Sequence, residues 1–221
     1  MSAEGGLRLY SYWRSSASYR VRIALNLKGL PFETVPVHLL DNGGEHHSEA
    51  FHQLNPQEVV PVLLDGGRVI RQSMAIIEYL DETYEGELKL LPPTARDRAR
   101  VRALAQVVAC DIHPVNNMRV MQYLEREFNV PQVERERWTR HWMIEGFKAF
   151  ETLLADSPST GQFCEGDDPS LADLCLVPQV YNGRRWGVDM TQFPTIERID
   201  EQCRKLAAFE NARPENQPDA P

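Results

Sequence analysis

The chain has 221 residues, and its content of 42% apolar and 25% charged residues is that of an ordinary soluble globular protein. The net charge of −8 argues against a nucleic-acid-binding protein, which would carry a basic face. No apolar stretch approaches the length of a membrane span, and the opening residues MSAEGGLRLY lack the parts of a signal peptide. The four cysteines have neither CxxC spacing nor neighbouring metal ligands, which predicts reduced thiols in a cytoplasmic protein.

The first 85 residues predict a small α/β domain. Period-2 patterns and turn signals predict strands at residues 7–12, 32–39, 62–64 and 68–71. The last two strands flank Asp65-Gly66-Gly67, which is typical of a hairpin. Helical periodicity covers residues 15–28 and 73–84, whereas residues 41–52 are polar and predict a loop with at most one helical turn. The order is therefore βαβ followed by ββα.

The rest of the chain predicts a linker at residues 86–93 and an all-helical domain at residues 94–221. Helical patterns cover residues 94–128, with a break near Pro114, and then residues 131–154 and 194–209. Ser170 and Asp173 have the spacing of a capping box before another apolar run. The final segment, ARPENQPDAP, is polar and rich in proline, and we expect it to fray.

Two features of the first domain predict a site for a small acidic peptide. A cis bond between Val60 and Pro61 would turn the Val60 backbone outward to pair with an extended peptide, although Pro61 could also be an ordinary strand start. Gln72 and Ser73 stand where a strand becomes a helix, and the free N–H groups there favour a carboxylate. The simpler alternative is that Ser73 only caps its helix.

Ser15 and Ser16 begin the first helix at the carboxyl end of the first strand, where open α/β sheets bind ligands. A hydroxyl and the N–H groups of a first helical turn would lower the pKa of a thiol placed there. This segment contains no cysteine, so the thiol would belong to a bound ligand.

Six segments of the chain resemble zeta-class glutathione transferases: LYSYWRSSASYRVRIALNLKGLPFE, NPQEVVPVLLDGG, IRQSMAIIEYL, CDIHPVNN, SLADLCLVPQV and FPTIERID. The resemblance spans residues 7–209 and implies a thioredoxin-like domain, a helical domain, a homodimer and glutathione as the cofactor. It implies glutathione-dependent cis–trans isomerisation of a dianionic maleyl diketo acid, with maleylacetoacetate ahead of maleylpyruvate. A broad transferase or α-haloacid dehalogenase, and a non-catalytic binding module, are the alternatives.

The resemblance also implies roles for individual residues. Ser15, with Ser16 and Arg14 beside it, would serve catalysis. Glutathione would be bound by His46, Val60, Pro61, Gln72, Ser73, His113, Asn116 and Asn117. Arg14, Arg119 and Arg185 would bind substrate carboxylates, since guanidinium grips a carboxylate with two hydrogen bonds. Ala17 stands where many members have a cysteine, which excludes disulfide exchange by a protein thiol at that position.

Other conspicuous residues are interpreted as structural. No metal site is expected, because His46 and His47 lack spaced partners to complete one. Trp138 and Trp142 are spaced as a core or interface pair on a helix. The remaining arginines considered are interpreted as solvated surface charges: Arg20, Arg22, Arg100, Arg102 and Arg135.

Overall fold

A computed structural model describes residues 6–86 and 88–221. Contacts within the chain divide it into two units. The first comprises Met1–Leu90 together with Lys205–Pro221, and the second comprises Leu91–Arg204. The boundary near residue 90 lies within the expected linker, but the helical domain expected to run to residue 221 ends earlier, because the last segment clusters with the first unit.

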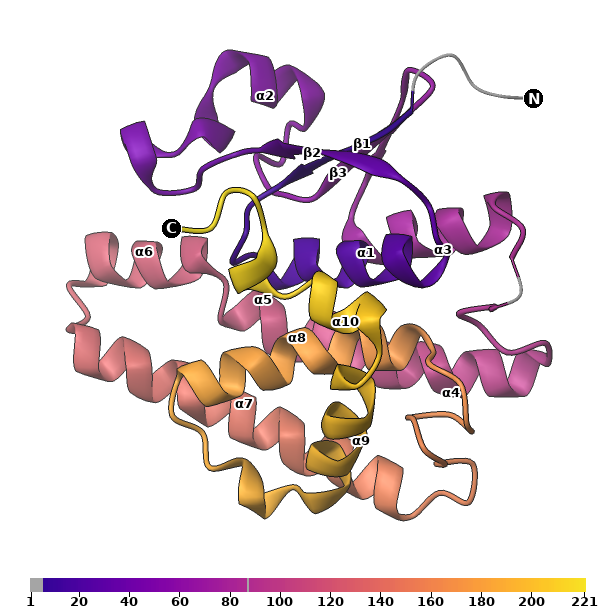
Figure 1. Cartoon of the computed structure of the whole chain (residues 1–221). Helices are drawn as coiled ribbons and strands as arrows, with labels where there is room; N and C mark the ends of the chain where they lie inside the picture. Colours follow the sequence, from indigo (N-terminus) through magenta and orange to yellow (C-terminus); the bar gives the residue numbers. More distant parts are fainter. Residues whose placement is uncertain (1–5, 87) are drawn as a thin grey trace. The chain divides into compact units, whose positions relative to one another are not determined.

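The first unit is built on a four-stranded mixed sheet in the order β2-β1-β3-β4. Its strands are β1 (Leu7–Ser11), β2 (Phe32–Pro36), β3 (Val62–Asp65) and β4 (Arg68–Arg71). β1 is parallel to β2 and antiparallel to β3, and β3 and β4 form the expected hairpin. α1 (Ser16–Leu27) and α3 (Ser73–Thr83) pack together on one face of the sheet (Figure 1). This βαβ-ββα order confirms the predicted thioredoxin-like architecture.

The connection from β2 to β3 is more ordered than expected. Two short turns, η1 (Asp41–Gly43) and η2 (Glu45–His47), precede α2 (Glu49–Leu54). Phe51 of α2 joins a buried cluster on the sheet face away from α1, together with Tyr12, Val37, Val60 and Val62. This cluster anchors both the end of β1 and the turn that precedes β3, because each contributes a side chain to it.

The last segment of the chain also belongs to the first unit. The helix expected at residues 194–209 is divided into α9 (Pro194–Arg204) and α10 (Ala207–Asn211), and η5 (Pro214–Asn216) follows. α10 packs along α1, where the amide of Asn26 donates to the Ala208 carbonyl at 3.0 Å. The expectation that the tail frays was wrong, because Arg22 of α1 donates to the Ala212 carbonyl at 3.1 Å and the Trp13 N–H donates to Asp219 at 2.8 Å. Composition alone does not reveal these partners.

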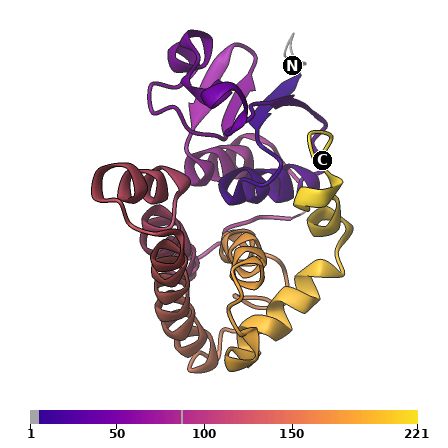
Figure 2. The same ribbon diagram turned by 90° about the vertical axis from the view of Figure 1, so that its left-hand side faces the viewer.

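The second unit is helical and is organised around α8 (Leu171–Arg185), which is buried over most of its length. α8 packs against α4 (Ala95–Gln106) and α9, while α7 (Gln132–Ala155) packs against α9 (Figure 2). Ser170 and Asp173 form the predicted capping box at the start of α8. Among the described residues no helix is long and apolar enough to span a membrane.

The predicted break near Pro114 is confirmed. α4 continues into a wider π-helical turn, η3 (Val107–Ile112), and then into one turn of helix, α5 (His113–Val115). The chain leaves the helix at Asn116 and restarts as α6 (Met118–Phe128). Turns of this π type frequently mark functional positions in helices.

Candidate functional site

Ser15 lies after the carboxyl end of β1 and is the N-cap of α1. Its hydroxyl oxygen accepts a hydrogen bond from the Ser18 N–H at 3.2 Å, and its own N–H donates to the Tyr12 carbonyl at 2.9 Å. A cap uses only the lone pairs of a hydroxyl, so its proton can still be donated. Ser15 can therefore cap the helix and hold an anion at the same time.

Arg14 and Ser16 flank this position differently. Arg14 is half-buried, and its guanidinium lies 5.3 Å from the centre of the Trp13 ring. Ser16 is buried as the first residue of α1. The helix start thus combines a hydroxyl, first-turn N–H groups and a nearby cation, all of which favour negative charge.

Val60 and Pro61 are joined by the expected cis peptide bond, just before β3 begins at Val62. Both residues are buried. The preceding turn is tied to α2, because the Asn55 amide donates to the Val59 carbonyl at 2.7 Å.

Gln72 and Ser73 form the start of α3, and Gln72 rather than Ser73 is the N-cap. Gln72 has a positive φ of 68° and makes no capping bond with its side chain, which instead donates to Gln57 at 2.6 Å. The simpler alternative, in which Ser73 caps its own helix, is therefore excluded. A strained residue at a helix start without a side-chain cap is an arrangement common at ligand sites.

The Ser73 hydroxyl accepts a hydrogen bond from the guanidinium of Arg20 at 3.3 Å, and both side chains are buried. Arg20 lies on α1, so the first two helices bring a cation and a helix N-terminus together. The assignment of Arg20 to the solvated surface was wrong. Sequence reasoning missed it because its partner is 53 residues away.

His46 is buried in η2, and the centre of its ring lies 3.8 Å from that of His47, with the two rings tilted by 41°. Burial lowers the pKa of His46. Its Nδ1 has no hydrogen-bond partner within the described residues. Gly44 has a φ of +98°, and a Cβ there would collide with the His46 ring. Over residues 6–86 and 88–221 no cluster of ligands could hold a metal ion.

Four of the predicted residues of the second unit gather at the break between α5 and α6. Asn117 caps α6 by accepting from the Arg119 N–H at 3.1 Å, and its amide nitrogen is 3.4 Å from His113 Nε2. Both polar atoms of the Asn116 amide are buried without a partner among the described residues. Such unpaired groups are rare and point to a ligand or an ordered water.

The predicted arginines of the second unit are both exposed. Arg119 is the second residue of α6, and Arg185 is the last residue of α8, with its guanidinium 5.2 Å from the Trp186 ring centre. The neighbouring Arg184 has a structural partner, because it donates to the buried Asp200 at 2.6 Å.

Three other arginines were also assigned wrongly to the solvated surface. Arg22 is buried. Arg100 is partly buried and pairs with Glu165, and it also donates to the Cys164 carbonyl at 2.8 Å. Arg135 is held by Glu125 through two hydrogen bonds of 2.8 Å.

Trp138 and Trp142 are partly exposed, which excludes a core role for the pair and leaves an interface role as a prediction.

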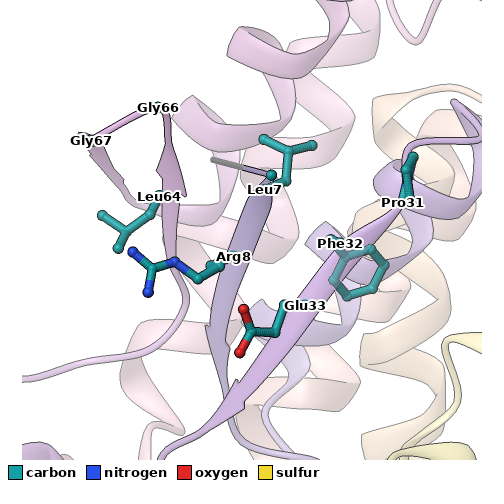
Figure 3. A pocket seen from close by; sticks show the side chains of 9 residues that line it. Leu7, Arg8, Pro31, Phe32, Glu33, Leu64, Gly66 and Gly67 are labelled. Atoms are coloured by element: carbon teal, nitrogen blue, oxygen red, sulfur yellow. The ribbon is translucent and has the colours of Figure 1, made fainter. Parts of the chain in front are cut away.

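A pocket of about 590 Å³ lies at the opposite end of the sheet from Ser15 (Figure 3). It is formed where β1 and β2 begin and where the β3–β4 hairpin turns, and it contains Arg8 and Glu33 on adjacent strands. The pocket is separate from the candidate site, because Ser15 follows the carboxyl end of β1 whereas the pocket is lined by residues at the start of that strand.

The first unit thus presents a hydroxyl at one helix start and a buried cation at another, with a histidine and a cis-proline turn in the same unit. This set suits a small peptide that carries a thiol and a carboxylate. The positions of Ser15 and of the cis bond before Pro61 were predicted from the neighbouring sequence, whereas the contribution of Arg20 was not.

Comparison with known proteins places these observations in a family. The profile of the glutathione S-transferase N-terminal domain matches residues 9–88. A probable maleylacetoacetate isomerase of Vibrio cholerae is 52% identical, with 97% of this chain and 98% of that protein covered. A holo structure of a zeta-class maleylpyruvate isomerase has 48% identity and a TM-score of 0.93, covering 97% of this chain and all of that one. A maleylacetoacetate isomerase of Methylobacterium extorquens, solved with malonate and glutathione, has 44% identity and a TM-score of 0.93, covering 97% and 99% of the two chains.

Proposed function

The chain belongs to the zeta class of the glutathione S-transferase family, and we propose that it catalyses the glutathione-dependent isomerisation of maleylacetoacetate to fumarylacetoacetate. The observation that carries this proposal is the geometry of Ser15, whose oxygen is used by the helix cap while its proton is available for an anion. Relatives with these names align over nearly the whole chain, which supports the same reaction here.

Bound glutathione supplies a thiolate, whose addition converts the cis double bond of the substrate into a single bond that can rotate before elimination. Ser15 donates a hydrogen bond from its hydroxyl to the sulfur and, together with the first-turn N–H groups of α1, lowers the pKa of the thiol. The positive charge of Arg14 next to the helix start acts in the same direction. Ser16 contributes to the same helix start.

The peptide part of glutathione is assigned to the rest of the site. Gln72, Ser73 and the uncapped first turn of α3 receive the γ-glutamyl carboxylate, supported by the buried charge of Arg20. The backbone of Val60, before Pro61, pairs with the cysteinyl residue. His46, His113, Asn116 and Asn117 contribute polar contacts, and the unpaired amide of Asn116 supports its assignment.

The substrate carries two carboxylates, and we assign them to Arg14, Arg119 and Arg185. Guanidinium groups bind carboxylates through paired hydrogen bonds and also stabilise negative charge that develops on an enolate oxygen. Arg185 is exposed at the end of α8, which supports its assignment to a substrate carboxylate. The Methylobacterium relative was solved with malonate, a dicarboxylate, which supports a dianionic substrate.

Maleylpyruvate is the second candidate substrate, because the maleylpyruvate isomerase structure is 48% identical over 97% of this chain. The two compounds share the maleyl half and differ in the acyl end. A broad transferase with α-haloacid activity would use the same thiolate, but it would not need several arginines for two carboxylates.

The deciding experiment follows turnover of both substrates with and without glutathione in the wild type, Ser15→Ala and Ser15→Thr. We expect strict dependence on glutathione, a loss of roughly 10²-fold or more in Ser15→Ala and partial retention in Ser15→Thr. Ser48→Ala is the matched control, because Ser48 caps α2 in the same way and only a cap is lost. Turnover without glutathione, or equal effects of Ser15→Ala and Ser48→Ala, would contradict the proposal.

We further propose that the protein is a cytoplasmic homodimer. All four cysteines are free, which suits a reducing compartment that also contains glutathione. The partly exposed pair Trp138 and Trp142 on α7 is a candidate part of the interface. Sedimentation of the wild type and Trp138→Ala tests this, and a monomeric wild type would contradict it.

A further inference from the structure

The last residues of the chain contact the loop that leads to Ser15. The carboxylate of Asp219 accepts a hydrogen bond from the Trp13 N–H at 2.8 Å, across a sequence separation of 206 residues. Both residues belong to the first unit. A charged acceptor makes such a bond stronger than a neutral one would. The end of the chain thus holds the backbone two residues before the proposed thiolate-binding serine.

Arg22 holds the same loop from the side of α1. Its buried guanidinium donates to the Trp13 carbonyl at 3.0 Å, to the Ser11 hydroxyl at 3.2 Å and, through Nε, to the Ala212 carbonyl at 3.1 Å. One side chain therefore connects the end of β1, the loop and the C-terminal segment. The planar fork of guanidinium suits it to join several acceptors in fixed directions.

Together these bonds fix the peptide groups on both sides of Trp13. The Trp13 N–H is held by Asp219 and the Trp13 carbonyl by Arg22, while the Ser15 N–H closes the turn on the Tyr12 carbonyl at 2.9 Å. The backbone preceding Ser15 consequently has little freedom to rotate. The orientation of the Ser15 hydroxyl is defined by this turn as much as by α1.

Electrostatics supports the pairing of the two residues. Burial lowers the pKa of Arg22 to about 10, and the charge of Asp219 opposes that shift. Asp219 Oδ1 is buried without a hydrogen-bond partner in the described part of the chain. The bond from Trp13 and the attraction of the buried Arg22 explain why the Asp219 carboxylate is accommodated there although one of its oxygens is unpaired.

We propose that Asp219 and Arg22 are positioning residues, which hold the Trp13–Ser15 loop so that the Ser15 hydroxyl points at the glutathione sulfur. This inference rests on the proposed role of Ser15. It assigns the C-terminal segment a supporting role in the catalytic apparatus of the first unit.

Four variants test the positioning role. Asp219→Ala removes both the charge and the acceptor, and Asp219→Asn keeps an oxygen that can accept from Trp13. Deletion of residues 218–221 removes the same bond without any new side chain. Glu215→Ala is the matched control. It removes one carboxylate from the same C-terminal segment, but the Glu215 carboxylate lies 3.5 Å from Arg213 and is not bonded to Trp13.

The primary readout is the pKa of the thiol of bound glutathione, measured by the ultraviolet absorbance of the thiolate as the pH is varied. Glutathione affinity by calorimetry and the hydrogen exchange of residues 11–18 are recorded on the same samples. In Asp219→Ala and the deletion we expect a raised thiol pKa, faster exchange and a kcat/KM lower by about ten- to a hundredfold. Asp219→Asn should recover most of this, and Glu215→Ala should match the wild type.

The outcomes separate the two proposals. If Asp219→Ala lowers the melting temperature but leaves the thiol pKa unchanged, the residue is only structural and the positioning inference is wrong. If Ser15→Ala itself leaves the thiol pKa unchanged, the proposed role of Ser15 is wrong. Should Asp219→Ala not fold, the nearly isosteric Asp219→Asn and the deletion are measured instead. An unchanged thiol pKa in the deletion would then overturn the inference.

Discussion

The guanidinium of Arg20 and the hydroxyl of Ser73 lie 3.3 Å apart, although they belong to different helices. Ser73 is the first residue of α3, so the buried charge of Arg20 lies directly behind a helix N-terminus that no side chain caps. Two sources of positive potential thus coincide. A carboxylate bound there would be attracted by both.

Arg20→Met should weaken glutathione binding. The change keeps the volume of the side chain but removes the charge, and a charged hydrogen bond of this kind contributes roughly 1.5–3 kcal/mol. We expect the Kd for glutathione to rise about ten- to a hundredfold, measured by calorimetry. Arg68→Met on β4, which is exposed, is the control. Equal affinity in Arg20→Met and the wild type would show that Arg20 serves the fold alone.

Arg185→Ala should mainly affect the KM for the substrate, whereas Arg184→Ala should mainly affect the melting temperature. Arg185 is proposed to bind a substrate carboxylate, so its loss should raise the KM for a dianionic substrate by about tenfold or more, with a smaller effect on the melting temperature than the loss of Arg184. Arg184 pairs with the buried Asp200, so its loss should lower the melting temperature instead. Steady-state kinetics with dianionic and neutral electrophiles, together with thermal unfolding, distinguishes them. A similar loss with neutral electrophiles in Arg185→Ala would contradict carboxylate binding.

The features that could be predicted from sequence are those set by local chemistry. The β3–β4 hairpin follows from Asp65-Gly66-Gly67, and the capping box follows from the spacing of Ser170 and Asp173. The position of Ser15 follows from the strand-to-helix junction. In each case the deciding residues are close together in the chain, so tertiary structure had little to add.

The features that sequence reasoning missed depend on distant partners. Arg20 and Arg22 resemble surface residues when only α1 is considered, because their acceptors are Ser73, Trp13 and Ala212. Burial of an arginine is favourable only where such acceptors converge, and no local pattern shows that they do. The ordered C-terminal segment was missed for the same reason.

Asp173→Ala should destabilise the second unit strongly. The fully buried carboxylate accepts from the Cys164 N–H at 2.9 Å and from the N–H and hydroxyl of Ser170 at 2.8 Å each. Removing it leaves buried donors unpaired, so we expect a loss of about 3 kcal/mol or more in the free energy of unfolding, measured with urea.

The control for Asp173 is the comparable pair at the surface. Asp97 accepts from the Thr94 hydroxyl at 2.6 Å at the start of α4, where water can replace the bond. Asp97→Ala should therefore cost much less. Similar losses in the two variants would mean that the cap, rather than burial of the donors, determines the effect.

His46 should make stability depend on pH in a defined direction. Burial is the main cause that lowers its pKa below 6.5 in the folded chain, with the neighbouring His47 adding to the effect. The unfolded chain therefore binds the proton first. The stability contributed by neutral His46 is fully present above about pH 6.5 and is lost as the pH falls through the lowered value.

His46→Gln should consequently flatten the dependence of the unfolding free energy on pH between about 7.5 and 5, measured by urea titrations. His141→Gln, which removes an exposed histidine from α7, should keep the wild-type slope. Glu58 affects stability in a lower range of pH than His46. Its hydrogen bonds from His47 and His52 lower its pKa below 4.5, so the stability it contributes is lost only at lower pH. An unchanged slope in His46→Gln would show that the buried ring is not the group that titrates.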